Sequence, residues 1–179
     1  MTAAPNFQST PVLVAAGSNI DPQANLCRAL DVLEQYFAPL QVSRAYANAA
    51  VGFEGADFVN LVVGFATGLP VAAVIAHLHE AEAACGRERN APKWAPRAMD
   101  LDILLFGDTV CIEPGLILPR PDLLRRPYML GPAAEIAPDW VHPTAHRSLG
   151  ELWTQMRQRD AHELRPIELT WAPVHGRPP

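Results

Sequence analysis

Two aspartates in one apolar segment are the clearest candidates for chemistry. Asp100 and Asp102 lie in the run Met-Asp-Leu-Asp-Ile-Leu-Leu-Phe, residues 99–106. Because strand side chains alternate, both acids would project from one face, with their Cα atoms about 6.5–7 Å apart. A run this apolar predicts a strand in the centre of its sheet, where carboxylates are costly unless positive charge compensates them. Two divalent cations would compensate these acids, and such a site suits phosphoryl-type chemistry.

The same alternation assigns the neighbouring residues to two faces. Leu104 and Phe106 would share the face of the acids, and the opposite face would carry Met99, Leu101, Ile103 and Leu105. Gly107-Asp108 predicts a hairpin turn, with residues 109–112 as the partner strand. The alternative for the acids is a strand end at which two aspartates simply meet water.

The loop before this strand, residues 86–97, carries four cations and one acid. An ordinary solvated loop would explain this composition, but a long irregular loop beside a possible metal strand is more often functional. Arginine suits phosphate because its planar fork binds two oxygens at once. A Walker-type loop is excluded, since Lys93 is the only lysine and follows Pro92. Any nucleotide must therefore be held by arginines, loop amides and metals.

Composition and charge bound the class of protein. The chain has 179 residues, of which 49% are hydrophobic and 18% charged. We expect a single domain over residues 1–179, with a core from about 11 to 156 and mobile tails at 1–10 and 172–179. The net charge of −5 argues against a general nucleic-acid binder. Six of the thirteen arginines lie between residues 87 and 126, namely Arg87, Arg89, Arg97, Arg120, Arg125 and Arg126.

Cysteine usage and the N-terminus bear on the compartment. Cys27, Cys85 and Cys111 are far apart and form no Cys-x-x-Cys pair, which favours a reducing environment. No secretory signal pattern is visible. The most apolar segment, residues 61–76, is interrupted by Gly-Leu-Pro and is too short to span a membrane. We therefore expect a soluble cytoplasmic protein.

Hydrophobic periodicity predicts the order strand, helix, strand, strand, helix, strand. The predicted strands are residues 11–16, 40–47, 58–67 and the aspartate strand, with a tight turn at 17–19 and an edge strand at 167–171. Asp21-Pro22 is expected to cap and open a helix to about residue 38, and Pro70 opens one to Gly86. A short helix is expected from about 128 to 136, and Ser148 to Glu151 forms a capping-box pattern before a last helix.

This order is typical of a split βαβ, ferredoxin-like α+β fold with a mostly antiparallel sheet. Helices packed on one face of the sheet would leave its other face open for a ligand.

Several other polar or aromatic residues have a structural and a functional interpretation. His142 and His146 have helical spacing, but Pro143 intervenes, so we interpret them as a surface turn rather than a metal site. Phe58 and Tyr128 are each more often core residues than stacking platforms. Asn60 on an apolar strand needs partners for its donors and acceptor, which a flat heterocycle could supply.

Taken together, these segments resemble the 6-hydroxymethyl-7,8-dihydropterin pyrophosphokinase family of the folate pathway, which transfers pyrophosphate from ATP to a pterin alcohol. The resemblance runs from about Val12 to Trp153. The most specific piece is the arginine and two-aspartate strand. The matching segments are residues 16–19, 57–60, 86–87, 94–102, 104–107 and 126–130.

The resemblance implies a ferredoxin-like α+β fold, ATP as co-substrate and two Mg²⁺ ions on Asp100 and Asp102. The catalytic residues that it implies are Arg87, Arg97, Asp100 and Asp102. The residues that it places on the nucleotide side are Glu82, Arg87, Arg89, Trp94, Arg97, Arg120 and Arg126. The pterin side would be formed by Asn48, Ala50, Gly52, Phe58, Asn60, Asp100 and Tyr128, with Asn60 reading the pterin edge between the rings of Phe58 and Tyr128.

Three features depart from the family pattern. Residues 48–52 read Asn-Ala-Ala-Val-Gly where the family has a Thr-Pro-Pro-like run. Arg120 lies between Pro119 and Pro121, where the family has a histidine on the nucleotide side. Residues 157–179 extend beyond the usual core. These departures leave open a non-catalytic pterin- or nucleotide-binding paralogue, or a two-metal transferase with a different acceptor alcohol.

The expected function is transfer of pyrophosphate from ATP to 6-hydroxymethyl-7,8-dihydropterin, giving the pterin diphosphate and AMP. Catalysis would rest on alignment and charge stabilisation. No side chain is an obvious general base, and that role stays unassigned. The partners would be small-molecule substrates, with no nucleic acid and no membrane, and we expect a monomer.

Overall fold

One antiparallel sheet organises the protein, seen here in a computed structural model that describes residues 9–48, 56–86, 98–159 and 164–173. The strand order is β5-β1-β4-β3-β8, and the short β2 also pairs with β4. The bounds are β1 Thr10–Ser18, β2 Gln41–Val42, β3 Ala45–Asn48, β4 Phe58–Thr67, β5 Asp100–Phe106 and β8 Arg165–Ile167. β1 and β4 form the centre, paired from Thr10↔Thr67 to Ser18↔Val59.

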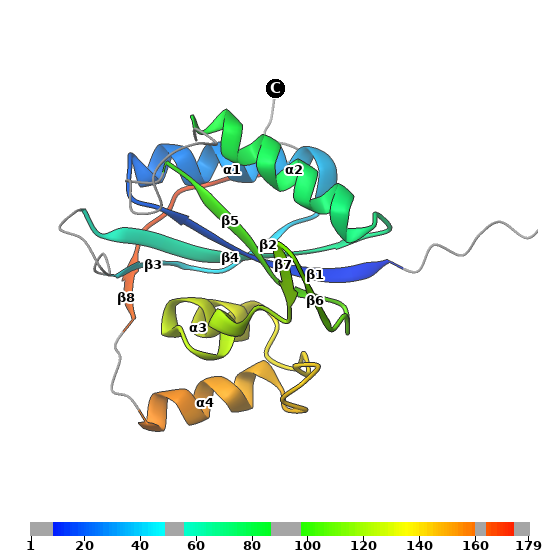
Figure 1. Cartoon of the computed structure of the whole chain (residues 1–179). Helices are drawn as coiled ribbons and strands as arrows, with labels where there is room; N and C mark the ends of the chain where they lie inside the picture. Colours follow the sequence, from blue (N-terminus) through cyan, green and yellow to red (C-terminus); the bar gives the residue numbers. More distant parts are fainter. Residues whose placement is uncertain (1–8, 49–55, 87–97, 160–163, 174–179) are drawn as a thin grey trace, which may run out of the picture.

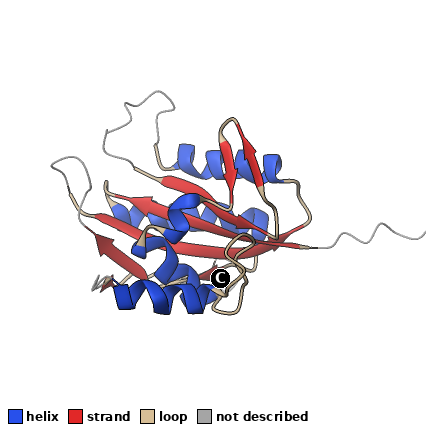
Figure 2. Ribbon diagram, turned by 60° about the horizontal axis from the view of Figure 1, so that its bottom comes forward, coloured by secondary structure: helices blue, strands red, loops and turns tan. Residues whose placement is uncertain are grey.

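Helices cover both faces of this sheet (Figures 1 and 2). α1 (Pro22–Phe37) and α2 (Val71–Ala84) lie on one face. α3 (Pro127–Ile136) lies on the other, with α4 (Leu149–Arg159) packed outside it. The prediction of helices on one face alone was therefore wrong.

Two hydrophobic cores explain this arrangement, because the central strands bury both of their faces. Val12 and Val14 of β1 join the core under α1 and α2. Leu13 and Val62 join a second core with residues of α3 and α4. Strands that are apolar on both faces must be covered on both sides. A ligand site on this sheet must therefore lie where the helices leave it uncovered.

The aspartate strand has the predicted extent but lies at the sheet edge, not at its centre. Its edge position was missed because other elements shield its outer side, which allows an apolar sequence. The backbone amide of Leu101 donates to the Glu82 carboxylate at 2.9 Å. The Arg120 amide donates to the Leu104 carbonyl at 2.9 Å. These two bonds occupy backbone groups that a free edge would leave to water.

A register shift between β1 and β5 changes the faces at the end of β5. Leu13 pairs with Leu105 and Val14 with Ile103, so Leu104 is an inserted residue. Both Leu104 and Leu105 enter the second core, while Phe106 packs against the first. The predicted faces of Leu105 and Phe106 were therefore wrong, because a bulge inserts one residue into the alternation. The aspartates precede the shift and keep their common face.

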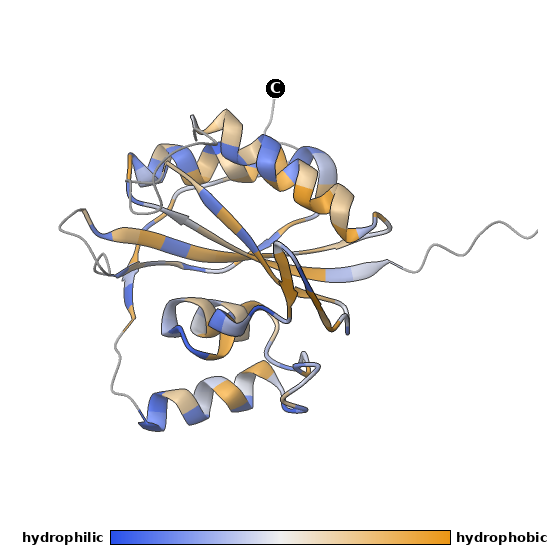
Figure 3. Ribbon diagram, viewed as in Figure 1, coloured by the Kyte–Doolittle hydropathy of each residue, from blue (hydrophilic) through white to orange (hydrophobic). Residues whose placement is uncertain are grey.

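The turn after β5 forms as predicted, but its predicted partner strand does not pair with β5. Gly107 has φ 51°, in the left-handed region that favours glycine. β6 (Cys111–Glu113) pairs instead with β7 (Leu116–Leu118) in a separate hairpin. Ile112 is 84% exposed, and Figure 3 shows hydrophobic residues along this hairpin. η1 (Pro121–Leu124) follows and leads into α3.

Of the predicted helix caps and turns, some are confirmed and others are not. The capping box of α4 is confirmed: the Ser148 amide donates to Glu151 at 3.1 Å and the Glu151 amide to the Ser148 hydroxyl at 3.3 Å. Pro22 opens α1, but Asp21 has φ 39° and its side chain makes no capping bond. The predicted turn at 17–19 starts later, because β1 continues to Ser18.

The single strand expected at 40–47 is broken into β2 and β3 at Ser43. There the Ser43 hydroxyl accepts the amide of Val62 at 2.9 Å in place of a backbone carbonyl. The expected edge strand at 167–171 exists as β8, but it begins at Arg165 and ends at Ile167.

His142 is buried in the connection between α3 and α4, so its interpretation as part of a surface turn was wrong. It is 2% exposed. Its Nδ1 accepts from the backbone amides of Thr144 at 3.3 Å and Ala145 at 3.2 Å. Burial, and secondarily the neighbouring His146, lower the pKa of His142 below its usual 6.5.

We expect this histidine to make the protein less stable in mild acid. Because its folded-state pKa is lowered, the unfolded chain binds the proton first as the pH falls below about 6.5. The free energy of unfolding should then fall by up to about 1.4 kcal/mol per pH unit until the folded-state pKa is passed. Urea denaturation between pH 7.5 and 5 measures this. His142→Asn, whose Oδ1 can replace the acceptor, should remove the dependence, whereas His146→Asn should retain most of it; equal pH profiles for His142→Asn and wild type would contradict the assignment.

Candidate functional site

One cross-strand row brings the predicted site residues together. Asp100 on β5 pairs with Gly17 on β1, Gly17 with Asn60 on β4, and Asn60 with Tyr46 on β3. Asp102 and Asn60 share the α3 side of the sheet, because Leu104 and Val62, two residues further along each strand, enter the core under α3. The acids and the asparagine, forty residues apart in sequence, thus lie on one face with a glycine between them.

Gly17 leaves room between these two groups. A Cβ at this position would lie 2.7 Å from Asn60 Oδ1 and 3.9 Å from Phe58 Cδ1. Real Cβ atoms essentially never approach an oxygen that closely. The sequence pattern identified this glycine only as a turn residue. The close approach of the Asn60 amide, which only the fold reveals, explains why glycine suits the position.

The side-chain amide of Asn60 has a hydrogen-bond partner on the neighbouring strand. Its Nδ2 donates to the Oδ1 of Asn48, the last residue of β3. This bond directs Asn60 Nδ2 toward Asn48, so Asn60 Oδ1 lies on the Gly17 side. The two asparagines therefore form one oriented hydrogen-bonding pair at the expected pterin edge. Ala50 and Gly52, also predicted for this side, lie outside the described residues.

A chain of alternating charges runs from Asp102 toward α3. Arg120 Nη1 lies 3.0 Å from Asp102 Oδ1, and Arg120 Nε lies 3.6 Å from Asp122 Oδ2. Arg126 Nε lies 3.8 Å from the other oxygen of Asp122. Arg120 and Arg126 were both expected on the nucleotide side; Arg120 contacts Asp102 directly, and Arg126 is linked to Arg120 through Asp122. Asp122 was missed, although its spacing of four from Arg126 is a recognisable signal for an ion pair.

Arg120 reaches Asp102 with part of its guanidinium desolvated. Its Nε is buried and makes no hydrogen bond within the described residues. Its backbone amide is already tied to β5, and Pro121 follows at the start of η1. A buried donor without a full partner is costly, which favours exchange of the guanidinium onto a better acceptor.

Two further contacts fix the strand that carries the acids. Glu82 of α2 is 7% exposed and holds the amide of Leu101, the residue between the aspartates. The Ser18 hydroxyl lies 2.6 Å from the carbonyl oxygen of Ala98, just before β5. Glu82 was predicted for the nucleotide side; its observed contact is with the backbone of β5.

Tyr128 lies in the first turn of α3, near the acids. Burial raises its pKa, and Asp122 and Asp100 raise it further, while Arg126 and Arg120 lower it. The phenol is thus neutral at physiological pH. Among the other predicted residues, Arg87, Arg89, Trp94 and Arg97 lie outside the described residues.

The carboxylates of this site suit a Mg²⁺ ion that takes only a few of its ligands from the protein. Within the described ranges no group of three or more His, Cys, Asp or Glu side chains could enclose a metal ion. Mg²⁺ is commonly held by one or two carboxylates plus substrate phosphates. Asp100 and Asp102 supply two such carboxylates, and the Asp102 side chain is 27% exposed. The residues therefore fit a metal that is completed by a phosphate ligand rather than one caged by protein.

Fold and site define an α+β protein of the ferredoxin-like class with paired acids at one edge of its sheet. Residues 13–138 match the family model described as 7,8-dihydro-6-hydroxymethylpterin-pyrophosphokinase (HPPK). The chain belongs to this family and is accordingly a diphosphokinase. It contains, among the described residues, no helix long and apolar enough to cross a membrane.

Curated relatives carry the same description. The chain is 32% identical over 147 residues to the 2-amino-4-hydroxy-6-hydroxymethyldihydropteridine pyrophosphokinase of Synechocystis, covering 80% of this chain and 75% of that one. It is 32% identical over 142 residues to the Aquifex aeolicus enzyme of that name, with 78% and 88% covered. It is 36% identical over 145 residues to the Pseudomonas aeruginosa enzyme, with 79% and 88% covered.

Solved structures of similar fold include HPPK-DHPS of Plasmodium falciparum. The wild-type protein with SDX-DHP has a TM-score of 0.69 at 12% identity, and the alignment covers 85% of this chain. The wild-type protein with pterin and p-hydroxybenzoate has a TM-score of 0.67 at 14% identity. The chain spans less than half of each of these longer chains, 45% and 44%. The likeness confirms the predicted fold.

The glycine at position 17 gives a direct test of this geometry. We expect Gly17→Ala to fold but to displace the Asn60 amide, since the new methyl would overlap Oδ1. The side-chain NH₂ resonances of Asn60 in a ¹⁵N spectrum report this displacement. Gly64→Ala is the control, because its Cβ would approach no atom more closely than the flexible side-chain ends of Ile136 and Leu13, both at 3.3 Å. Unchanged Asn60 resonances in Gly17→Ala would show that the close approach does not exist in solution.

Proposed function

We propose that the chain transfers the pyrophosphate of ATP to the hydroxymethyl group of 6-hydroxymethyl-7,8-dihydropterin, giving the pterin diphosphate and AMP in folate biosynthesis. The observation that carries the proposal is the row in which Asp100, Gly17 and Asn60 lie side by side, in a chain of the HPPK family. At one end of the row, the Asn60 amide can hydrogen-bond the edge of the pterin ring. At the other end, the paired acids can hold the metal ions that bind the phosphates of ATP.

At the pterin end, the proposed roles follow from the Gly17 gap. Asn60 presents its Oδ1 beside Gly17, where an amide acceptor can meet the N–H groups of a pterin edge. The rings of Phe58 and Tyr128 would enclose the heterocycle, and the neutral phenol of Tyr128 adds no charge there. Asn48 orients Asn60 through their shared hydrogen bond.

At the phosphate end, Asp100 and Asp102 would hold two Mg²⁺ ions together with phosphate oxygens of ATP. When bound, such ions would supply positive charge to the reacting phosphates. The alcohol oxygen forms a bond to the β-phosphorus and its proton is released to water, while the bond from that phosphorus to the α–β bridging oxygen breaks, so AMP leaves. Glu82 and Ser18 position the strand from which both acids project.

On the nucleotide side, the proposed ligands are Arg126 and Arg120 together with Arg87, Arg89, Trp94 and Arg97. Arg120 is paired with Asp102. A guanidinium on a proposed metal ligand competes with the metal, so Arg120 must exchange Asp102 for a phosphate oxygen when metal and nucleotide bind. This exchange would couple metal binding to nucleotide binding.

We also propose a cytoplasmic monomer acting on small molecules. The three cysteines, Cys27, Cys85 and Cys111, are free thiols, which supports a reducing compartment.

Production of AMP tests the proposed reaction. We expect Asp100→Ala and Asp102→Ala each to lower turnover by about 10²-fold or more while the protein stays folded, because each removes an electrostatic group from the reacting phosphates. The assay measures AMP from ATP, Mg²⁺ and the pterin, with thermal unfolding alongside. Asp108→Ala, an exposed acid just after β5, is the control.

Three outcomes of this assay separate the candidates. Near-normal turnover by either aspartate variant would contradict the metal pair. Binding of pterin and ATP without AMP would favour the non-catalytic paralogue that the changed residues 48–52 and Arg120 suggest. AMP released only with another alcohol would favour a different acceptor.

Binding of Mn²⁺ to the nucleotide-free protein tests the competition by Arg120. We expect Arg120→Gln to bind Mn²⁺ several-fold more tightly than wild type, because the Asp102 oxygen loses its guanidinium partner. Electron paramagnetic resonance of free Mn²⁺ measures this. Arg125→Gln, a neighbouring exposed arginine, should behave as wild type. Equal affinities for Arg120→Gln and Arg125→Gln would show that Arg120 does not compete, whereas no Mn²⁺ binding by any variant, even with an ATP analogue, would contradict the metal site itself.

A further inference from the structure

The described C-terminal segment, residues 164–173, crosses the edge of the sheet from the α3 side to the α1 side, and we call it the C-terminal strap (Figure 1). It lies beyond residues 13–138, which match the family model. At one end, Leu164 packs against Gly131 of α3. At the other, Trp171 Nε1 donates to Asp31 of α1 at 2.9 Å. The strap is thus attached to both helical layers.

Between these attachments the strap forms β8 on the edge strand β3. Ile167 pairs with Ala45, Pro166 with Tyr46 and Arg165 with Ala47. Tyr46 in turn pairs with Asn60. Pro166 is therefore the outer member of the same cross-strand row that contains Asn60, Gly17 and Asp100. Without β8, the four-residue β3 would be a short strand with a free edge.

A second contact of the strap reaches past β3 to the start of β4. The Arg165 guanidinium forms an ion pair with Asp57, the residue before Phe58. Asn48 and Phe58, which pair with each other, are the last members of the β3–β4 ladder. Arg165 therefore joins the strap to the chain on the far side of Asn48. The two strands that carry Asn48 and Asn60 are held from outside by one segment.

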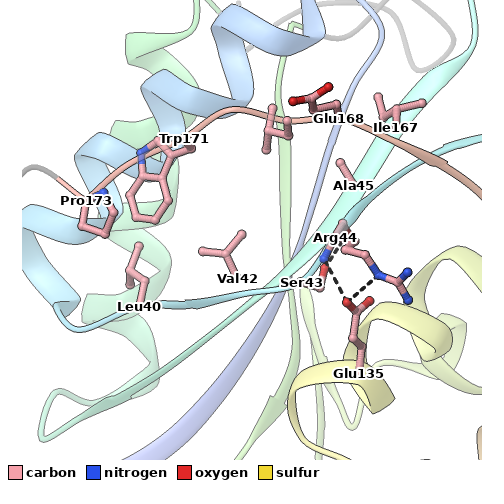
Figure 4. Close-up of a pocket in the computed structure, with 11 residues that line it drawn as sticks. Leu40, Val42, Ser43, Arg44, Ala45, Glu135, Ile167, Glu168, Trp171 and Pro173 are labelled. Atoms are coloured by element: carbon pink, nitrogen blue, oxygen red, sulfur yellow. Dashed lines mark hydrogen bonds and ion pairs between the residues drawn. The ribbon is translucent and has the colours of Figure 1, made fainter.

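The space between the strap and the sheet is not completely filled by side chains. A pocket of about 600 Å³ separates Trp171 and Pro173 from Leu40 and Val42, and the Arg44–Glu135 ion pair lines its other side (Figure 4). The strap is thus not packed tightly along the β2 end of the sheet. Beside this pocket, Ile167, Leu169 and Trp171 pack against the first core. The contacts of the strap with the sheet itself are the pairing of β8 with β3 and the ion pair of Arg165 with Asp57.

We infer that the C-terminal strap is a positioning element for the Asn48–Asn60 pair and so tunes binding of the pterin but not of the nucleotide. The selectivity follows from topology. β3 lies beyond β4 at one side of the sheet, whereas the aspartates, Arg120 and Arg126 lie on or beside β5 at the opposite edge. Loosening β3 should therefore disturb the asparagine pair and leave the phosphate end unchanged. The inference rests on the proposed function in that the ligand of Asn60 is taken to be the pterin.

Charge reversal at Arg165 tests the inference in the full-length protein. Arg165→Glu should weaken binding of the pterin about two- to fivefold, the range expected for loss of an exposed ion pair, and raise its KM with little change in kcat. Affinity for a non-hydrolysable ATP analogue should not change. Arg157→Glu in α4 makes the same charge change at an exposed position and should alter neither affinity.

Two further measurements distinguish positioning from general stability. Arg165→Asp combined with Asp57→Arg should restore pterin affinity, since the exchanged charges can pair again. An equal loss of pterin and nucleotide affinity, or no loss of either, would overturn the inference. If wild type binds no pterin, the proposed function fails. The role of the strap is then tested by the side-chain amide resonances of Asn60, because Arg165→Glu should shift them and Arg157→Glu should not. Unmoved resonances would overturn the role of the strap.

Discussion

The structure depends on holding two carboxylates on one face of an edge strand without letting that strand detach. Like charges two residues apart repel, and an edge strand has only one neighbour to hold it. β5 meets this constraint with its full pairing to β1, with Glu82 on the Leu101 amide, and with the Arg120 amide on the Leu104 carbonyl. The Arg120 side chain meanwhile places positive charge on Asp102. One residue thus both covers the free edge of β5 and balances its charge.

The second requirement is a gap beside those acids in an otherwise closely packed sheet. Gly17 supplies it, because any larger residue would overlap the amide of Asn60. The gap is useful only if the asparagine is fixed on its far side, and this depends on Asn48, on β3 and ultimately on the strap. The site therefore draws on contacts across the whole width of the sheet, from β5 at one edge to β8 at the other.

Much of this protein could be predicted from local pattern. The bounds of β4 and β5, the start of α1 at Pro22 and the capping box of α4 follow from periodicity and from side-chain chemistry within a few residues. The common face of Asp100 and Asp102 follows from strand geometry alone. The errors share one cause: the pattern of a single segment does not say what lies against it. The apolar sequence of the shielded edge strand β5 predicted a central strand, and the sequence around the buried His142 predicted an exposed turn.

By itself, then, the sequence determined the family, the ferredoxin-like α+β class and the pairing of the two acids, because those depend on residue types at short spacing. Only the tertiary structure decided that Arg120 contacts Asp102, that Asn48 orients Asn60 and that β8 closes the edge of the sheet. Each of these contacts joins residues 12 or more positions apart. Their partners are selected by strand order, register and the bulge at Leu104, which are properties of the packed chain as a whole.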